Sequence, residues 1–388
     1  QDVNVTDMDA WCQIAFGDLF ATPMFYAENL YLNGKPVTSV VVPQGVTILY
    51  NTFRGFKDLT QVTLPDSLTS IGWYAFTDCS SLVSINIPDN VTSIGKHAFT
   101  GCSKLINASI GSNVTSIDDG AFDRCSSLVS ITIPDSVTSI GSQAFMDCSS
   151  LTNITIGSGV SSIGSEAFSR CSSLTDVYLA DMDAWCRITF GGDYSTPMWY
   201  AKNIYLKEEK ITSVTMPQGI TTVQYTFCGF QDLVTVTIPD SVTSIGERAF
   251  CSCSSLTGIT IPDSVTSISS EAFQNCASLQ SITIGSGVTS ISGSSTFSSP
   301  FYNCKNLESV YITDMAAWCG IAFESNYANP LYYAKNLYLN GAKVETLEIP
   351  EGVESISQYA FIDATCVKRV VLPKSLSSVA VQAFSGCS

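Results

Sequence analysis

Residues 128–150 read LVSITIPDSVTSIGSQAFMDCSS, and units of the same length and pattern recur along most of the chain. The leucine that opens a unit returns at intervals of 23 residues, at Leu59, Leu82, Leu105, Leu128, Leu151 and Leu174. A fixed period of this length is typical of repeat proteins, in which each unit stacks on its neighbours. We therefore expect residues 1–388 to form a single continuous repeat domain and not a set of separate globular domains.

Each segment of this unit predicts a local structure. Residues 128–133 alternate apolar and polar side chains towards their end, which indicates a strand with one face in the core. Pro134 has no N–H group for strand pairing and ends the strand. Residues 137–141 predict a second short strand followed by a bend, and Ala144 and Phe145 are expected to fill the core from a helical turn. The fold class is thus a β-rich (α/β) solenoid with a parallel sheet along one side.

A longer unit of 37 residues, marked by a tryptophan, interrupts the array at three places that start near residues 1, 174 and 307. Each copy opens with a short helix candidate, whose N-terminal capping residues are predicted to be Asp7, Asp181 and Asp314. Asn33-Gly34 predicts a type I′ hairpin turn in the first copy. Glu208-Glu209 takes the place of that dipeptide in the second copy, where the hairpin is less strongly indicated.

The charge balance excludes some classes of partner. The chain has 18 Lys and Arg against 34 Asp and Glu, a formal net charge of -16, which repels phosphate backbones and anionic lipid. No apolar run approaches the roughly 20 residues that span a bilayer. We expect no nucleic-acid partner and no membrane insertion in this segment, with any export signal or anchor outside it. Neither end resembles a polar capping repeat, so we interpret the sequence as part of a longer array.

The pattern AFxxCSSLxxIxIPDSVTSIG, together with the tryptophan-bearing long units, resembles the BspA-like leucine-rich repeats, also called the Treponema pallidum type. The resemblance covers essentially all 388 residues and implies a leucine-rich-repeat array of about fifteen coils. It also implies a cell-surface or secreted protein of a host-associated bacterium, with a role in attachment to host matrix proteins or other cells. It brings no catalytic residue and no cofactor. The pattern departs locally at residues 53–56 and 227–230, where Phe replaces the repeat Cys.

The sequence contains little that points to catalysis or metal binding. His97 is the only histidine, so neither a catalytic triad nor a histidine-based metal site is expected, and His97 is interpreted as a solvated side chain. No Asp-x-Asp-x-Asp-Gly calcium loop is present. Asp181-Met182-Asp183 is better explained as a helix cap than as a metal site. We therefore predict no enzyme, no metal site and no cofactor.

Fifteen cysteines follow the repeat more closely than they follow a disulfide framework. Nine occupy one repeat position, three residues after a Phe: Cys79, Cys102, Cys125, Cys148, Cys171, Cys253, Cys276, Cys304 and Cys387. A buried column of small thiols that donate to backbone carbonyls is favoured over a stack of metal or redox ligands. Cys228 and Cys251 follow the Phe of adjacent coils, and either a disulfide or two reduced thiols fits their positions.

The outward positions of the long strand are mostly threonine, which suits either a solvated strand or a surface that binds ice or a glycan. Near the long units aromatic rings take over, and we predict binding residues at Tyr31, Tyr178, Tyr205, Tyr311, Tyr338 and Trp199. Exposed aromatic rings are frequent in binding hot spots. The competing interpretation is that these rings only cover the apolar edge left by the inserted helix. Three further aromatic pairs, each with at least one ring expected in the core, are Phe25-Tyr26, Trp199-Tyr200 and Tyr332-Tyr333.

Three functions from different classes are compatible with the sequence. The favoured one is a cell-surface or secreted binding protein that presents an elongated repeat surface to host matrix protein, glycan or another cell surface. The alternative is a passive spacer that projects another domain from the cell. The third, an enzyme, is disfavoured by the single histidine and the absence of a catalytic motif.

Overall fold

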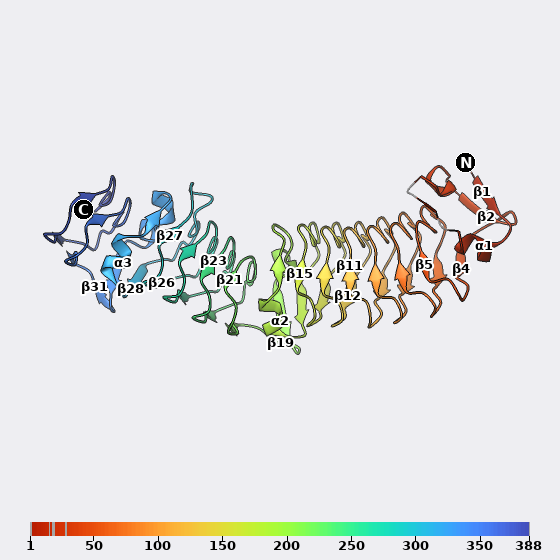
Figure 1. Ribbon diagram of the computed structural model, residues 1–388, viewed down its shortest axis with the longest axis horizontal. Coiled ribbons are helices and arrows are strands. Elements are labelled where there is room, and N and C mark those ends of the chain that lie inside the picture. Colours follow the sequence, from red (N-terminus) through yellow and green to blue (C-terminus); the bar gives the residue numbers. More distant parts are fainter. Residues whose placement is uncertain (1, 15, 18–19, 28, 388) are drawn as a thin grey trace. The chain divides into compact units, whose positions relative to one another are not determined.

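The computed structural model describes residues 2–14, 16–17, 20–27 and 29–387. They divide into two compact units, Gln1–Lys210 and Ile211–Ser388. Each unit is a solenoid of stacked coils whose strands are joined in parallel ladders (Figure 1). A parallel-sheet solenoid is the predicted fold class, which is confirmed. The continuity of the array across Lys210 and Ile211 stays a prediction.

The first unit contains two ladders on different walls of the solenoid. The longer strands form a nine-stranded sheet made of β4 (Ser39–Val41), β6 (Gln61–Thr63), β8 (Ser84–Asn86), β10 (Asn107–Ser109), β12 (Ser130–Ile133), β14 (Asn153–Ile156), β16 (Asp176–Leu179), β18 (Asn203–Leu206) and β19 (Glu209–Lys210). The two-residue strands form a seven-stranded ladder of β5 (Ile48–Leu49), β7 (Ser70–Ile71), β9 (Ser93–Ile94), β11 (Ser116–Ile117), β13 (Ser139–Ile140), β15 (Ser162–Ile163) and β17 (Thr189–Phe190). Before them, β1 (Asp2–Val5), β2 (Asn29–Leu32) and β3 (Lys35–Pro36) form a separate sheet.

The second unit repeats this plan with a divided long sheet. Its long strands are β20 (Ser213–Thr215) paired with β22 (Thr235–Thr237), then a sheet of β24 (Gly258–Thr260), β26 (Ser281–Ile284), β28 (Ser309–Ile312), β30 (Asn336–Leu339) and β31 (Ala342–Lys343). The short ladder is β21 (Thr222–Val223), β23 (Ser244–Ile245), β25 (Ser267–Ile268), β27 (Ser290–Ile291) and β29 (Ala322–Phe323). The last coils pair β32 (Thr346–Glu348) with β34 (Arg369–Val371) and β33 (Ser355–Ile356) with β35 (Ser378–Val379).

The 23-residue period sets the register of the ladders. Ser130 faces Asn153, and Asn153 in turn faces Asp176, with every pair parallel. Side chains alternate across a strand, so a fixed register keeps each repeat position in one column. The inward isoleucines at 131 and 154 are buried in consecutive coils. The repeat leucines are buried in the same way, which confirms the predicted core.

The third wall is a column of phenylalanine rings. From Phe76 to Phe168 successive rings stack with centroids 5.1 to 5.5 Å apart, and every ring is fully buried. The prediction of a helical turn here is wrong, because the segment forms consecutive non-helical turns. The physical reason is that Gln143 and Asp147, on either side of Phe145, have φ of 57° and 56°. These left-handed conformations cannot belong to a right-handed helix.

The long units contain the predicted helices α1 (Met8–Cys12), α2 (Met182–Cys186) and α3 (Met315–Cys319). The side chain of Asp7 accepts from the N–H groups of Asp9 and Ala10, and Asp181 and Asp314 cap their helices in the same way. The tryptophan of each helix is buried. Later in the sequence of each long unit come short helical segments: η1 (Pro23–Phe25), η2 (Pro197–Trp199), and η3 (Asn326–Ala328) with α4 (Leu331–Ala334).

A hairpin closes each long unit. Asn33 and Gly34 have φ of 51° and 76° between β2 and β3, which confirms the predicted turn. In the second copy Lys207 and Glu208 occupy the turn, with φ of 50° and 68°. The assignment of Glu208-Glu209 to this turn is therefore wrong by one residue. Glu209 already pairs with Leu206 in the ladder, so it is the first residue of the returning strand.

Candidate functional site

Four of the predicted binding tyrosines meet in two stacked pairs. In the first unit Tyr178 of β16 faces Tyr205 of β18, with ring centroids 5.0 Å apart and planes inclined by 15°. In the second unit Tyr311 of β28 faces Tyr338 of β30 at 4.7 Å and 22°. All four rings are half-buried. We call these two sites the tyrosine pairs.

The long unit creates the pairs because its extra residues leave the sheet and then return to it. The chain passes through α2 and η2 after β16 and comes back as the parallel neighbour β18, with Asp176 opposite Asn203. The aromatic residue of the strand before the helix therefore meets the aromatic residue of the strand after it. The same path through α3 and α4 joins β28 to β30.

Each tyrosine pair has a short polar row on one side and a lysine on the other. Thr155 precedes Tyr178 in the ladder, and Lys210 lies across the hairpin from Tyr205. Beside the rings, Asn203 donates to Asp176 at 2.8 Å. Desolvation and the nearby Asp176 carboxylate raise the pKa of Tyr205. Stacking covers one face of each ring, so a ligand meets the ring edges, the hydroxyl groups and the outer faces.

Tyr31 and Trp199 are not part of these pairs. Tyr31 lies on β2, where its neighbour across the parallel ladder is Asn4 and its neighbour across the hairpin is Pro36. Trp199 lies in η2 and packs against Tyr194 with centroids 4.7 Å apart. The structure therefore brings together four of the six predicted residues and leaves the other two separate.

The aromatic residues that follow the long-unit prolines are not core residues. All six rings of Phe25-Tyr26, Trp199-Tyr200 and Tyr332-Tyr333 are half-buried or exposed, so the expectation of one core ring in each pair is wrong. Polar contacts hold two of these rings near the surface. The hydroxyl of Tyr200 accepts from the N–H of Arg170 at 2.9 Å, and that of Tyr333 donates to Ser299 Oγ at 3.0 Å.

A groove of about 550 Å³ lies on the threonine face of the second unit. Its lining includes Thr237, Thr260 and Thr283, with the carboxylates of Asp240 and Asp263 at the strand ends. The groove coincides with the interruption between β22 and β24, where no ladder pairing joins the described strands. Thr283 is the ladder neighbour of Tyr311, so the threonine row leads directly to the second tyrosine pair. We call this feature the threonine groove.

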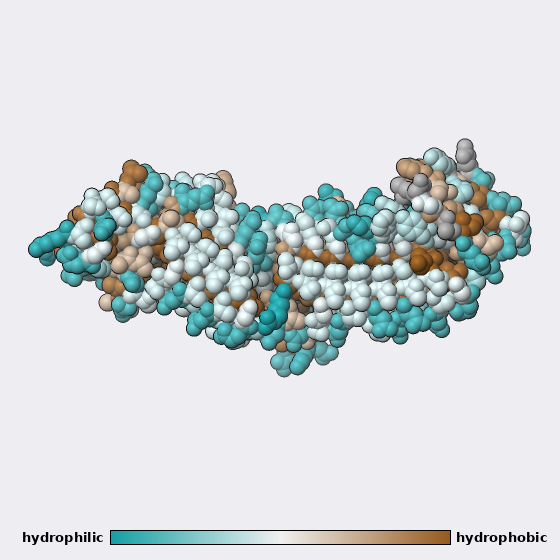
Figure 2. Space-filling view, in the orientation of Figure 1, coloured by the Kyte–Doolittle hydropathy of each residue, from teal (hydrophilic) through white to brown (hydrophobic). Residues whose placement is uncertain are grey.

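The surface around these sites is only weakly polar. Figure 2 shows a broad pale band over the first unit, beside a narrower brown stripe. The pale colour fits serine and threonine, whose hydropathy is close to neutral. Val83, Ile106 and Val129, which directly follow the repeat leucine, are each more than 40% exposed. The sequence interpretation did not single out this aliphatic column, although the residue after each leucine carries its signal.

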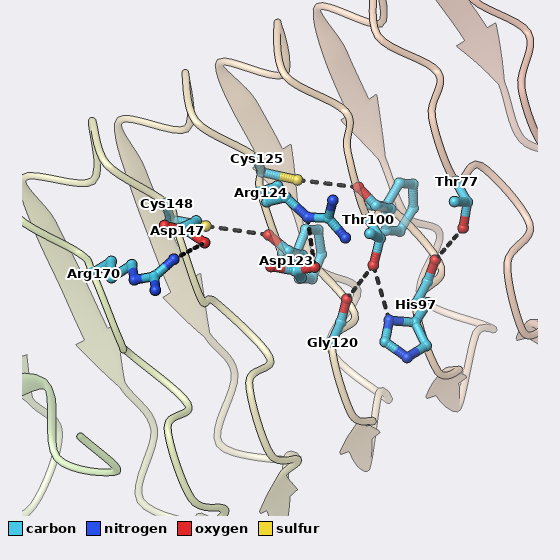
Figure 3. Close-up of polar contacts among 12 residues, drawn as sticks. Thr77, His97, Thr100, Gly120, Asp123, Arg124, Cys125, Asp147, Cys148 and Arg170 are labelled. Carbon is cyan, nitrogen blue, oxygen red and sulfur yellow. Dashed lines mark hydrogen bonds and ion pairs between the residues drawn. The ribbon is translucent and has the colours of Figure 1, made fainter. Parts of the chain in front are cut away.

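The cysteine column is structural. Cys125 Sγ donates to the carbonyl of Phe99 at 3.3 Å, and Cys148 Sγ donates to that of Phe122 at 3.2 Å (Figure 3). Burial is the main cause that raises the pKa of both thiols. All fifteen cysteines are free, including Cys228 and Cys251. The structure therefore has the reduced alternative for these two thiols.

His97 is more constrained than a solvated side chain. It is half-buried, and its ring stacks on Tyr74 with centroids 5.3 Å apart and planes inclined by 12°. Its Nδ1 atom lies 3.1 Å from the hydroxyl of Thr100. The interpretation of His97 as simply solvated is wrong, because its left-handed backbone, with φ of 54°, directs the ring along the wall towards the preceding coil.

No group of three or more His, Cys, Asp or Glu side chains in the described ranges is arranged to hold a metal ion. Within the same ranges, none of the helices has the length and apolar character needed to cross a bilayer.

A family model described as BspA type leucine rich repeat region (6 copies) matches residues 27–149, 93–184, 201–328 and 333–388. The chain belongs to this family. The match confirms the resemblance seen in the repeat pattern. The family is one of repeat proteins, and its model covers the short units and parts of the long ones. No curated protein matches the chain.

Solved structures similar to the chain include several bacterial proteins. A leucine-rich repeat protein from Bacteroides ovatus is 26% identical with a TM-score of 0.53, over 90% of this chain and 84% of that one. A leucine rich cell surface protein from Faecalibacterium prausnitzii is 24% identical with a TM-score of 0.42, over 83% and 90%. The pneumococcal vaccine antigen PcpA is 19% identical with a TM-score of 0.44, over 88% and 79%. The first of these shares the leucine-rich-repeat fold with this chain.

Proposed function

We propose that this BspA-type chain is a cell-surface or secreted binding protein that attaches to a host matrix protein, a glycan or another cell surface. The observation that carries the proposal is the recurrence of a stacked, half-buried tyrosine pair on the long sheet of each unit. Repeat arrays of this kind expose a long regular surface, and ligand contacts concentrate where that surface changes character. The tyrosine pairs are such places.

The core does not need the four tyrosines. The inward column of the same strands is filled by buried Val177, Leu179 and Ile204, and the opposite wall by the phenylalanine stack. Tyrosine rings on an outward face present a large contact area with few rotatable bonds, which is why they dominate hot spots. The second pair also adjoins the threonine groove, whose hydroxyl and carboxylate groups suit hydrogen bonding to a polar ligand.

The test compares attachment of the folded wild-type chain with that of two double variants, Y178S/Y205S and Y311S/Y338S. Binding to immobilised fibronectin, fibrinogen, collagen and mucin is measured by surface plasmon resonance. Hot-spot truncations of this kind are expected to weaken attachment by about 30-fold or more, which corresponds to roughly 2 kcal/mol. A matched control is T132S/T155S, which changes the same outward rows without removing an aromatic ring.

The spacer alternative gives a different result in the same experiment. A passive spacer has no ligand of its own, so the wild-type chain attaches to none of the surfaces above background. If both folded double variants attach as the wild type does, the tyrosine pairs do not carry the binding. The binding function would then belong to another part of the surface. Circular dichroism of each variant establishes that it is folded.

A further inference from the structure

Four side chains from successive coils form one continuous stack at the start of the first unit. The guanidinium carbon of Arg54 lies 4.9 Å from the ring centre of Phe25 and 5.4 Å from that of Tyr74. The imidazole of His97 stacks on the other side of Tyr74 at 5.3 Å. Arginine over aromatic faces is held by cation–π attraction and dispersion. The stack fixes the plane and position of the Arg54 side chain.

Gly55 allows the long unit to approach this stack. A Cβ atom at residue 55 would lie 2.9 Å from the carbonyl oxygen of Met24, and the residue has φ of +75°. Both facts favour glycine, because other residues rarely adopt this conformation and would clash with the neighbouring backbone. The close approach places Phe25 directly against Arg54.

Two cavities lie on either side of the Arg54 side chain. One, of about 300 Å³, is lined by Phe25, Lys57 and Asp78 among others, and the second, of about 250 Å³, by Tyr74, His97 and Arg124 among others. Arg54 and Asp78 line both of them. Each cavity has room for a small polyatomic ion or for one polar group of a larger ligand. We call the two cavities together the Arg54 pocket.

The Arg54 guanidinium has an unused donor. Its Nη1 atom is buried and has no hydrogen-bond partner in the part of the chain that the structure describes. Burial lowers the pKa of Arg54, while the nearby Asp78 carboxylate acts in the opposite direction. A buried charged donor without an acceptor costs free energy, and native proteins rarely leave one without a ligand, a water molecule or an ion.

The threonine hydroxyls of the second cavity are already used in hydrogen bonds. Figure 3 shows the chain of contacts in which the Thr100 hydroxyl donates to the carbonyl of Gly120 at 2.7 Å. Thr100 Oγ must then accept from His97 Nδ1, which fixes the protonated nitrogen of the neutral imidazole. Thr77 likewise uses its hydroxyl proton on the carbonyl of His97. The donors that remain for a ligand therefore belong to the arginines.

The local charge also favours an anion. Three cationic side chains, Arg54, Lys57 and Arg124, are accompanied by two carboxylates, Asp78 and Asp123. Asp123 is occupied by an ion pair with Arg124 Nε at 3.0 Å, and Asp78 is solvent-exposed. The overall charge of the chain is -16. Exposed charges that lie more than about 8–10 Å from the pocket have little effect on it, because they are screened at physiological salt.

We propose that the Arg54 pocket binds an oxyanion, either a free sulfate or carboxylate ion or the corresponding group of a larger ligand. Arginine donates through two parallel N–H groups to such oxyanions, and these charge-assisted bonds are about twice as strong as neutral ones. The oxyanion accepts from Arg54 Nη1, while Arg124 and Lys57 add positive charge. The site lies on the phenylalanine wall, so it is independent of the tyrosine pairs on the long sheet.

The coil that follows the second long unit provides an internal comparison. Residues 227–230 read Phe-Cys-Gly-Phe where residues 53–56 read Phe-Arg-Gly-Phe, so Cys228 replaces Arg54. The position of Tyr74 is taken there by Arg248, which is bound to Glu271 at 2.7 Å. The coil after the second long unit therefore keeps the glycine of the turn and lacks a guanidinium at position 228, so we do not assign an oxyanion site there.

The single histidine makes this pocket directly observable. The imidazole C–H proton signal of His97 is recorded by one-dimensional NMR while sodium chloride is replaced by sodium sulfate at constant ionic strength and pH. We expect a saturable shift for the wild-type chain. R54M keeps an unbranched side chain between the two rings and should weaken sulfate binding by about 10-fold or more. R54K keeps the positive charge and loses the two parallel N–H groups of the guanidinium. Its affinity for sulfate should lie between those of the wild type and R54M.

The matched control is R170M. Arg170 is an exposed arginine of the same wall, paired with Asp147 at 3.3 Å, so this variant removes one positive charge outside the pocket. It should bind sulfate as the wild type does. A shift that does not saturate, or equal affinity of wild type and R54M, overturns the proposal. If circular dichroism shows that R54M is unfolded, the comparison of R54K with wild type decides.

The source of the oxyanion is identified with three further ligands. Sodium acetate tests a carboxylate, and N-acetylglucosamine 6-sulfate is compared with unsulfated N-acetylglucosamine. Tighter binding of the sulfated sugar than of free sulfate supports a glycan-borne group. Equal binding of the two supports recognition of the free ion. A response of His97 to the unsulfated sugar equal to that of the sulfated one overturns the proposal, because recognition would not depend on the anion.

Discussion

Tyr311 and Tyr338 are 27 residues apart in sequence, yet they face each other on adjacent parallel strands with ring centroids 4.7 Å apart. The intervening residues form α3 and α4 and leave the sheet between the two strands. Tyr178 and Tyr205 repeat the arrangement in the first unit. In the second and third long units, an inserted helix thus separates two strands whose outward tyrosines stack, whereas in the first long unit Tyr31 faces Asn4.

The stacking energy of such a pair is expected to be modest. In a double-mutant cycle of Y311S, Y338S and the double variant, the coupling energy should be about 0.5–1.5 kcal/mol, the usual value for an aromatic pair. Urea denaturation monitored by circular dichroism provides the four free energies of unfolding, with that of the wild type as the reference. A coupling above about 3 kcal/mol would exceed the usual range for neighbouring residues and make the pair primarily a packing feature.

The phenylalanine wall should be much more sensitive to truncation. Phe145 is fully buried and stacked between Phe122 and Phe168, so F145A is expected to lower the free energy of unfolding by about 3–5 kcal/mol. Phe297 offers a control, because it is 71% exposed and F297A should change the stability by less than about 1 kcal/mol. Similar effects of the two variants would contradict the assignment of this wall to the core.

The column thiols should be unreactive in the native protein. Burial raises the pKa of Cys171 to about 12, and the thiolate is the reactive form. At pH 8 iodoacetamide should therefore modify the buried thiols of the column only after the protein unfolds. Cys387, the half-buried member of the column, should react before the others. Peptide mass spectrometry of labelled native and denatured protein measures this order. Rapid native labelling of Cys171 would show that the column is accessible.

Asp123 stands at a position where a threonine would fit better. Thr77 and Thr100 occupy it in the two preceding coils, and each donates to a carbonyl of the next coil at 2.6 or 2.7 Å. Asp123 is buried, and its Oδ1 atom has no partner among the described residues. D123T should therefore increase the free energy of unfolding by about 1 kcal/mol at pH 7. Arg124 is largely exposed, so the lost ion pair contributes little.

The pH dependence of this effect has a defined sign. Burial, the largest cause, raises the pKa of Asp123 in the folded state. A carboxyl with a raised pKa destabilises the fold when ionised, and the penalty disappears as the pH falls through that folded pKa. The stability advantage of D123T over wild type should consequently shrink from pH 7 towards pH 4, as followed by thermal unfolding. An advantage that grows on acidification would contradict a raised pKa.

The sequence by itself determined the solenoid, its register and the outward position of the four tyrosines, whereas their stacking in pairs came from the structure. Local pattern suffices for these features, because identical units that stack in parallel must bring residues 23 positions apart into one column. Each of the deciding signals is local in sequence and acts within a few residues. These signals are the alternation around Ile131, the prolines that end the strands and the aspartates that cap the helices. Tyr178 and Tyr311 could be recognised as outward residues for the same reason.

Only the tertiary structure decided the features that depend on variable positions. Phe25, Arg54, Tyr74 and His97 come from different coils and share no motif, so no period predicts that they stack. The sequence also did not reveal the interruption between β22 and β24. Nor did it reveal that no ring of Phe25-Tyr26, Trp199-Tyr200 and Tyr332-Tyr333 lies in the core. A repeat fixes which positions become neighbours, but the contact between two irregular side chains depends on backbone geometry and competing partners in three dimensions.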